Sequence, residues 1–446
     1  MDLKQRIEQL EPAKRLALLR KLRSSGHPVA LTWARDLSAR DAMPDLALEA
    51  YLEPGIRPGA EPARGKRALL TGATGFLGAF LLRELTRDPR RRVVALVRDA
   101  DAEVGAARVR DNVARYGLAD EVDLSRVSVV AGRLDALRFG LDEAAFRTLA
   151  DDVDVVYHSG ALLNFLYGYQ PFIGPNVVGT QEVLRLACTG RAKPVHHVST
   201  VFFFMSGPHA PDAPPVDEHT ARREPPRTWG GYAQSKWVSE RLVWEAADRG
   251  LPVTVHRLGL VAGSSETGAC SREEIFVRYL QGLPRLGVYP ELPGDVSFEV
   301  GCVDFCARAM VALGERDDAA GACFHLHAER PSPLHALGAE LLLARGEALR
   351  PIAYAEWLRL LNDRVVHDRQ NPLQPLVPFL AQPWPGTDWT FHETLAHRPP
   401  ISSTGVRAGA GPLGVPCRTR WRPGASRPRG SRPAAGSPAP AATARS

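Results

Sequence analysis

The feature that most constrains the fold is a glycine-rich turn between a short apolar run and a helical pattern. Residues 67–70 (RALL) are typical of a buried strand, and TGATGFLG (71–78) leads directly into the amphipathic segment AFLLREL. Gly72 permits a tight turn, Gly75 lets the backbone approach a pyrophosphate, and Gly78 lets helix and strand pack closely. A helix that starts there offers free N–H groups to phosphate oxygens, so the pattern predicts a dinucleotide-binding turn. The predicted cofactor contacts of this turn are Thr71, Gly72, Thr74, Gly75, Phe76, Leu77 and Gly78.

Further apolar runs follow the turn and alternate with helical segments. They lie at 93–97, 127–132, 153–160, 194–200 and 251–259. Strands separated by helices in this way predict an α/β fold with a Rossmann-like, doubly wound parallel sheet. After Gly263 the alternation weakens, and we expect a smaller, mainly helical C-terminal substrate-binding cap.

The same patterns divide the chain into four expected parts. Residues 1–60 are predicted to form a helical N-terminal extension and linker, 61–263 the NADP-binding domain with the catalytic residues, and 264–398 the cap. Residues 399–446 contain eight arginines and no acidic residue among many Pro, Gly, Ala and Ser, and we expect them to be disordered.

Charge and composition exclude several classes of protein. The net charge is +6, but the tail contributes +8 and the other 398 residues −2, so nucleic-acid binding is not supported. No apolar run reaches the roughly 18 residues that a membrane helix needs, and the charged N-terminus does not resemble a signal peptide. The six scattered cysteines form neither a disulfide pattern nor a metal site, which predicts a cytoplasmic protein without a metal ion.

The residue after the second predicted strand indicates which nicotinamide cofactor is used. Arg98 lies 20 residues beyond Gly78, where an NAD-binding chain would place an acidic residue. A guanidinium there suits the 2′-phosphate of NADP by charge and by bidentate geometry. The alternative is a solvated surface arginine.

Three further residues point to reduction chemistry. Tyr232 and Lys236 form a YxxxK pair that lies on one face of a helix. A nearby ammonium favours the phenolate of tyrosine, and this ammonium can also bind the cofactor ribose. Thr200 ends the strand PVHHVST, at the edge of the sheet where ligands bind, and its hydroxyl can donate to a substrate carbonyl. A simple strand-end cap is the alternative for Thr200 alone.

The order of these motifs resembles that of extended short-chain dehydrogenases/reductases. Several segments are more narrowly similar to the thioester reductase domains that terminate nonribosomal peptide and polyketide assembly lines, and to carboxylic acid reductases. The resemblance runs from about Asp45 to Leu395, and its most discriminating parts surround Asn164, Asn176 and SKWVSE (235–240). The other matching segments are DLALEAYLEPGIRP (45–58), TGATGFLG, VRDNVARYGL (109–118), HHVST, LPGDVSF (292–298) and CVDFCARAMVALG (302–314).

This resemblance implies roles for individual residues. It implies Thr200, Tyr232 and Lys236 as the catalytic residues, and it places NADPH beside Gly72, Gly75, Gly78, Arg98, Arg108, Gly160, Ala161 and Lys236, with Asn176 supporting the site. Two positions depart from the family pattern. Arg133 replaces an aspartate near the adenine, and Leu258 replaces a proline in a loop beside the nicotinamide.

The resemblance implies NADPH-dependent reductive release of an acyl or peptidyl thioester as an aldehyde, with further reduction to an alcohol left open. The partner is expected to be a phosphopantetheinyl carrier protein acting in trans, because no carrier segment precedes residue 60, and the enzyme is expected to be a monomer. Two alternatives remain. One is an extended short-chain reductase, epimerase or dehydratase acting on a soluble small molecule, and the other is a non-catalytic NADP-sensing binding protein.

Overall fold

The computed structural model describes residues 46–207, 213–220, 228–272, 274–292, 296–334, 349–381, 383, 388 and 390–403. Its centre is a seven-stranded sheet in which all neighbouring strands are parallel, in the order β11-β6-β5-β4-β1-β2-β3. This confirms the predicted Rossmann-like α/β fold. The strands are β1 (Arg67–Thr71), β2 (Arg92–Val97), β3 (Val127–Ala131), β4 (Val155–His158), β5 (Val195–Thr200), β6 (Val253–Leu258) and β11 (Cys323–Leu326).

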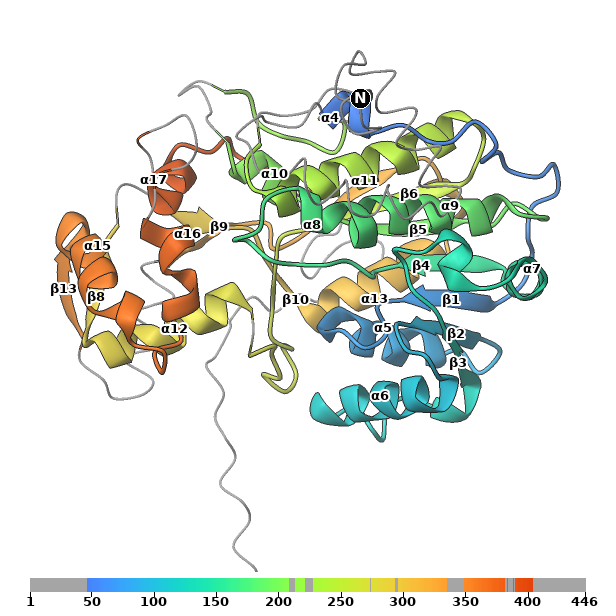
Figure 1. Ribbon diagram of the computed structural model, residues 1–446, viewed down its shortest axis with the longest axis horizontal. Coiled ribbons are helices and arrows are strands. Elements are labelled where there is room, and N and C mark those ends of the chain that lie inside the picture. The colour runs from blue at the N-terminus through green and yellow to red at the C-terminus, as the bar shows by residue number, and fades with distance from the viewer. Residues whose placement is uncertain are drawn as a thin grey trace, which may run out of the picture.

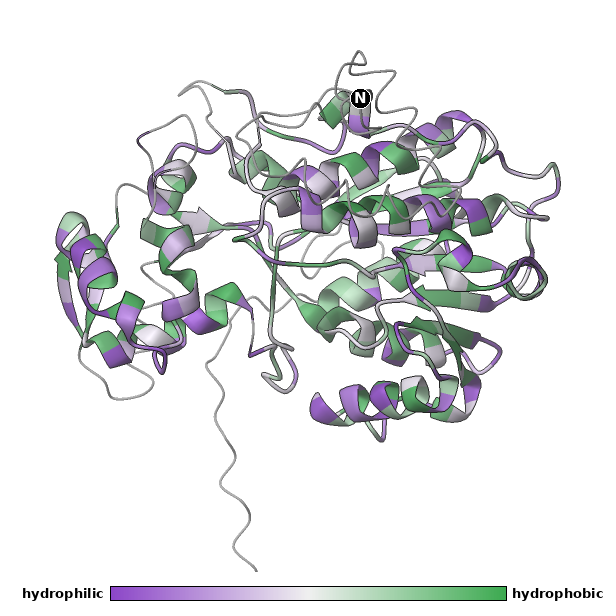
Figure 2. Ribbon diagram, viewed as in Figure 1, coloured by the Kyte–Doolittle hydropathy of each residue, from purple (hydrophilic) through white to green (hydrophobic). Residues whose placement is uncertain are grey.

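Helices cover both faces of this sheet (Figure 1). Two hydrophobic clusters lie on the two faces, and neighbouring residues of β1 alternate between them, with Leu69 in one and Leu70 in the other. One face carries α5 (Phe76–Thr86), α6 (Ala102–Arg115) and α13 (Val303–Gly314), and the other carries α4 (Leu46–Glu49), α7 (Glu143–Asp152), α9 (Gly179–Cys188) and α11 (Gly231–Asp248). Figure 2 shows mostly hydrophobic residues along α5 and α13, and mixed hydropathy along α6.

Local sequence signals set the ends of several helices. Asp101 and Asp142 are the N-caps of α6 and α7, and their carboxylates accept hydrogen bonds from backbone N–H groups of the first turn. Gly287 ends α12 (Ile275–Leu286) in the left-handed conformation, with φ of 74°.

The shorter helical elements are α8 (Gln170–Phe172), α10 (Phe202–Met205), η2 (Leu124–Arg126), η3 (Leu137–Gly140), η4 (Ile173–Val178), η5 (Asp317–Ala319), η6 (Val365–His367) and η7 (Gln374–Leu376).

The topology determines where a ligand can bind. The chain runs outward from β1 through β2 to β3 and then returns to β4 on the other side of β1. Ligands of open α/β sheets bind at such a reversal, beyond the carboxyl ends of the strands. The glycine turn follows β1 directly, so it lies at this reversal.

A smaller unit lies beside the carboxyl edge of the sheet and forms the cap (Figure 1). Its strands β8 and β13 are parallel partners, and two short strand pairs, β7 with β10 and β9 with β12, lie nearby. The elements are β7 (Leu260–Ala262), α12, β8 (Val288–Glu291), β9 (Ser297–Phe298), β10 (Val300–Cys302), β12 (Ser332–Pro333), β13 (Arg350–Ala353), α15 (Tyr354–Asp363), α16 (Val377–Ala381) and α17 (Phe391–Ala396).

The limits expected for the cap, 264–398, need a correction. Residues 303–326 fall inside that range, but α13 packs against α5 and β11 is the edge strand of the seven-stranded sheet. The reason is a non-local pairing in which Cys323 lies opposite Val255 and Leu326 opposite Leu258. The cap therefore interrupts the Rossmann unit instead of following it.

Residues 399–403, the first of the expected disordered tail, lie within the described part of the chain and make defined contacts. Val216 donates to the Pro400 carbonyl at 2.8 Å, Ser402 donates to the Val216 carbonyl at 2.9 Å, and Ile401 is buried. The first tail residues are ordered because they complete a backbone bridge and fill an apolar site. Residues 1–45 and 404–446 lie outside the described residues, and so does most of the predicted N-terminal extension. Within the described part of the chain, no helix combines the length and the apolarity that a membrane crossing requires.

Candidate active site

The glycine turn packs directly against the segment that follows β4. Gly72 has φ of +80°, and a Cβ there would lie 2.8 Å from the Gly160 nitrogen. A Cβ on Gly78 would lie 2.0 Å from the Gly72 carbonyl oxygen. Helix α5 begins at Phe76, and its N-cap Gly75 is exposed and has no side-chain cap among the described residues. The turn therefore leaves the N–H groups of the first helical turn accessible to an anionic ligand.

Thr71 joins the turn to the β4 edge. Its hydroxyl accepts from the Gly160 N–H at 2.9 Å and lies 2.7 Å from His158 Nδ1. The other ring nitrogen of His158 lies 3.0 Å from the Thr180 hydroxyl. Burial lowers the pKa of His158 to about 3, so the ring is neutral and acts as a fixed hydrogen-bonding bridge. The sequence analysis missed this role of His158.

Asn112 is a second residue that the sequence analysis missed. It is buried on α6, and its amide Nδ2 donates to the carbonyl oxygens of Ala73 at 3.1 Å and Gly75 at 2.9 Å. One side chain thus holds both ends of the tight part of the turn. The signal in the sequence was the family segment VRDNVARYGL, which identified the position without giving its contact.

Asn176 is the residue that the resemblance implied to support the site. It lies on η4, a π-helical turn that contains Pro175. Its side chain accepts from the Leu162 N–H at 2.7 Å and donates to the Leu162 carbonyl at 3.1 Å. It also donates to the Ser235 hydroxyl on α11 at 2.9 Å. Asn176 therefore fixes the loop after β4 relative to α11, the helix that carries Tyr232 and Lys236.

The structure brings Thr200 and Tyr232 together. Thr200 is the last residue of β5, and its Oγ1 accepts from the Phe202 N–H at 3.1 Å and donates to the Leu258 carbonyl at 3.3 Å. Tyr232 is half-buried at the start of α11. Burial raises the pKa of Tyr232, and a hydrogen bond with the Thr200 hydroxyl opposes this rise. The two hydroxyls therefore form one polar patch at the carboxyl edge of the sheet.

Lys236 lies one turn further along α11, on the same face as Tyr232. Its ammonium donates to the Val198 carbonyl at 2.7 Å. Burial lowers the pKa of Lys236 to about 8, although the charge of Glu240 raises it. The contact that opposes the raised pKa of Tyr232 comes from Thr200. The expectation that Lys236 favours the Tyr232 phenolate thus stays a prediction.

Glu240 lies four residues after Lys236 on α11, as Lys236 lies four after Tyr232. The sequence analysis did not single out Glu240. Its carboxylate accepts from Ser199 Oγ at 2.5 Å, Trp244 Nε1 at 3.0 Å and Arg257 Nη2 at 2.6 Å. Burial raises the pKa of Glu240, but Arg257 and the hydrogen bonds from Ser199 and Trp244 together outweigh this effect and hold it below its usual range. This buried ion pair attaches α11 to β5, next to Thr200, and to β6.

Four charged residues lie near the carboxyl ends of β2 and β3. Arg98 is exposed, and its carbonyl accepts from Arg108 Nη1 at 2.6 Å. Arg133 forms a bidentate pair with Asp135, at 3.0 and 2.8 Å. Arg133 and, more weakly, Arg98 hold the pKa of Asp135 below its usual range. The acid expected at position 133 is therefore replaced by an arginine that is paired with an acid two residues later.

Two remaining positions from the sequence analysis also have clear places. Ala161 is exposed in the loop after β4, directly after Gly160. Leu258 keeps a regular strand register, opposite Thr200 and Leu326. Its carbonyl accepts from the Thr200 hydroxyl and from the Val201 N–H. The replacement of proline by leucine is thus accommodated within β6.

Among the described residues, no group of three or more His, Cys, Asp or Glu side chains is placed to hold a metal ion.

Comparison with known proteins identifies the family. The profile of the NAD_binding_4 family, described as "male sterility protein", matches residues 70–310. The chain belongs to this family. It is 36% identical over 330 residues to a linear gramicidin synthase of Brevibacillus parabrevis, and 36% identical over 267 residues to L-2-aminoadipate reductase of Schizosaccharomyces pombe. The alignments cover 74% and 55% of this chain but only 6% and 18% of these longer relatives.

Solved structures of reductase domains are similar over most of the chain. The terminal R domain of the myxalamid PKS-NRPS pathway has a TM-score of 0.70 and 35% identity, and the match covers 81% of this chain and 89% of that domain. The R domain of a nonribosomal peptide synthetase from Mycobacterium tuberculosis has a TM-score of 0.61 and 28% identity, covering 77% and 86%. The expected similarity to terminal reductase domains of assembly lines is confirmed.

Proposed function

We propose that this protein is an NADPH-dependent thioester reductase that releases a carrier-bound acyl or peptidyl group as an aldehyde. The observation that carries this proposal is the meeting of the glycine turn and the Thr200–Tyr232 hydroxyl pair at the carboxyl edge of one parallel sheet. A cofactor bound at the turn and a carbonyl bound at the hydroxyls would share that edge. The match to whole reductase domains supports the same reaction.

The residues of the turn fit a dinucleotide. Side chains are excluded at Gly72 and Gly78 by close backbone approach, and the uncapped first turn of α5 offers N–H donors to a pyrophosphate. Arg98, with Arg133 nearby, supplies positive charge suited to a 2′-phosphate, which supports NADPH over NADH. Arg108 contributes indirectly because its guanidinium braces the Arg98 carbonyl. When bound, NADPH supplies the hydride that reduces the thioester carbonyl carbon.

The side chains of this chain do the remaining work. The hydroxyls of Thr200 and Tyr232 bind the carbonyl oxygen and stabilise the negative charge that develops there. Tyr232 then gives its proton to that oxygen, and the raised pKa of its buried hydroxyl keeps this proton in place until the charge forms. The resulting hemithioacetal breaks its C–S bond to give an aldehyde and the thiol of the carrier. Lys236 positions the ribose and, through its charge, stabilises the phenolate that Tyr232 becomes when it gives up its proton.

The proposed partner is a separate phosphopantetheinyl carrier protein, and we propose that the reductase acts on it as a monomer. The test mixes purified protein, NADPH and acyl-loaded carrier, and follows the loss of nicotinamide absorbance together with aldehyde formation. We expect turnover of the carrier thioester and none of sugar nucleotides.

Tyr232→Phe is the matched control because it removes one oxygen and keeps the ring. It should still bind NADPH, while turnover falls by about 10²–10⁴-fold. If the unaltered protein binds NADPH tightly but reduces no thioester, the sensing alternative gains. If it turns over sugar nucleotides instead, the small-molecule alternative gains.

A further inference from the structure

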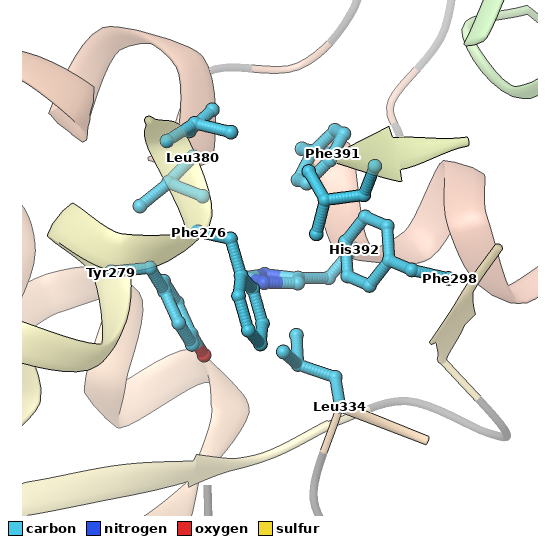
Figure 3. A pocket seen from close by; sticks show the side chains of 9 residues that line it. Phe276, Tyr279, Phe298, Leu334, Leu380, Phe391 and His392 are labelled. Atoms are coloured by element: carbon cyan, nitrogen blue, oxygen red, sulfur yellow. The ribbon is translucent and has the colours of Figure 1, made fainter. Parts of the chain in front are cut away.

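Aromatic rings hold Tyr232 on the side of the cap. The Phe165 ring lies edge-on to Tyr232, with centroids 5.5 Å apart, and its centroid lies 5.4 Å from that of Phe379. Phe379 packs on Phe391 with centroids 4.2 Å apart, and Figure 3 shows Phe391 beside a pocket of only about 30 Å³. Apolar contacts of this kind exclude water but have no preferred direction. The orientation of Tyr232 relative to the glycine turn must therefore come from polar contacts elsewhere.

His158, the last residue of β4, makes a hydrogen bond with each ring nitrogen, and its partners determine which nitrogen carries the proton. Thr180 Oγ1 lies 2.6 Å from the Asn176 carbonyl oxygen, which can only accept, so the hydroxyl hydrogen is directed there. The same Oγ1 lies 3.0 Å from His158 Nε2 and can only accept from it, so Nε2 carries the proton. The ring is neutral, so Nδ1 accepts from the Thr71 hydroxyl at 2.7 Å, and that hydroxyl accepts from the Gly160 N–H. Every hydrogen bond of this series therefore has a defined direction.

Asn176 carries the series of hydrogen bonds on to α11. Its side-chain amide donates to Ser235 Oγ at 2.9 Å, and Ser235 donates to the Tyr232 backbone carbonyl at 2.8 Å. His158, Asn176 and Ser235 are 3%, 2% and 0% exposed, so water cannot take the place of a missing partner. The series therefore connects the glycine turn after β1 with the backbone of Tyr232.

The neighbouring strand carries a second buried histidine that takes no part in this series. His197 lies opposite His158 in the register of β4 and β5, and the two ring centroids are 5.3 Å apart. Within the described part of the chain, neither ring nitrogen of His197 has a hydrogen-bond partner. The two histidines thus differ in their hydrogen bonds and not in their burial.

We propose that His158, protonated at Nε2, is a positioning residue that fixes the glycine turn relative to Tyr232. The proposal rests on the proposed function, in which the turn holds the hydride donor and Tyr232 binds the carbonyl that receives the hydride. His158 acts through Thr71 on one side and through Thr180 and Asn176 on the other. A misplacement of reacting groups by about 1 Å can cost about 100-fold in rate, so the rigidity of this series bears directly on turnover.

The kinetic test compares His158→Phe with His197→Phe, using NADPH and acyl-loaded carrier. His158→Phe leaves the Thr71 hydroxyl without its acceptor and Thr180 without its donor. We expect kcat to fall by about 10–100-fold while KM for the carrier thioester stays unchanged. His197→Phe removes no hydrogen bond and should keep the kcat of the unaltered protein. His158→Gln, whose amide supplies both an acceptor and a donor, should recover part of the loss.

A second readout needs neither turnover nor cofactor. In protein with isotopically labelled histidine, the nitrogen chemical shifts of a neutral ring distinguish the protonated nitrogen from the unprotonated one. We expect the His158 signal, assigned by its loss in His158→Gln, to show the proton on Nε2. It should not titrate near neutral pH, because burial lowers the pKa of His158 to about 3. Thr180→Val keeps the shape of the side chain and removes the acceptor, so it should shift this signal.

The outcomes separate this proposal from the proposed function. If His158→Phe folds and keeps kcat, or raises only KM for NADPH, the positioning role is overturned and thioester reduction stands. A proton on Nδ1 would overturn the role as well. If no thioester is reduced, the proposed function fails, whereas the Nε2 signal and its response to Thr180→Val still decide whether the series exists. Should His158→Phe not fold, Thr180→Val provides the kinetic test, because it breaks the same series and should also lower kcat.

Discussion

The buried pair between Glu240 and Arg257 gives the sharpest test of how α11, the helix of Tyr232 and Lys236, is held. Glu240→Gln preserves the shape of the side chain and removes its charge. The side chains of Arg257 and Glu240 are 0% and 2% exposed, so solvent cannot compensate the guanidinium that remains. Removing one partner of such a pair costs about 3–5 kcal/mol of folding free energy. We expect a loss in this range.

Equilibrium unfolding in urea, followed by tryptophan fluorescence, measures this loss. The matched control is Glu143→Gln, because Glu143 pairs with Arg147 on the surface, where the two side chains are 58% and 69% exposed. An exposed pair at this spacing contributes only about 0.3–0.5 kcal/mol. The two glutamate-to-glutamine changes therefore differ mainly in burial.

A double variant distinguishes an unpaired charge from a loss of shape. In Glu240→Gln/Arg257→Met the buried charge is absent, so part of the stability should return. The reasoning is refuted if Glu240→Gln costs less than about 1 kcal/mol, or if the double variant loses the sum of the two single losses.

Three further predictions concern the cofactor, the pH profile and the chain end. Arg98→Ala should raise KM for NADPH by about tenfold or more and leave NADH use unchanged, because at least one charge-assisted hydrogen bond is lost. The control is Arg110→Ala, because Arg110 is an exposed arginine on α6. A preference of the unaltered protein for NADH would contradict the assignment. Lys236 carries its ammonium charge below its pKa of about 8, so kcat/KM for NADPH should fall as the pH rises through 8. In Glu240→Gln this fall should occur at lower pH, because the charge of Glu240 raises the pKa of Lys236. An unchanged pH profile would show that Glu240 does not influence the charge of Lys236. Truncation after Ser403 should leave thermal stability unchanged. Truncation after Arg398 should lower the free energy of unfolding by about 1.5–3 kcal/mol, because the buried Ile401 side chain is lost. Equal stability of the two truncated chains would show that the bridge between Ile401 and Val216 contributes nothing.

The sequence was sufficient to predict the sheet and its glycine turn because both depend on local patterns. The runs that became β1 to β6 are short and mainly apolar, as strands of a sheet covered on both faces require. The turn was predictable because Gly72 and Gly78 occupy positions where a Cβ would collide with backbone. Thr200 and Tyr232 could be placed at one edge because that edge is where parallel strands end.

Contacts between distant segments were beyond the reach of these patterns. Asn112 meets the glycine turn from a helix 37 residues along the chain from Gly75, and no local spacing indicates that hydrogen bond. The four residues of β11 are too few to show a strand period, and only their register with β6 places them in the main sheet. The contacts of Ile401 could not be predicted for the same reason. Ile401 pairs with Val216, which lies far back in the chain.

These non-local contacts converge on the carboxyl edge of the sheet, where Thr200 lies. Ser199, the neighbour of Thr200, donates to Glu240 on α11, and Arg257 joins that carboxylate to β6. Arg257 Nη1 lies 3.3 Å from His325 Nε2 on β11, and His325 Nδ1 lies 2.7 Å from the Ser402 carbonyl. One polar network therefore runs from β5, the strand that ends in Thr200, to Ser402 among the last described residues. The seventh strand and residues 400–402, which the sequence assigned to the cap and to a disordered tail, are thus part of the scaffold that holds Thr200 and Tyr232 in place.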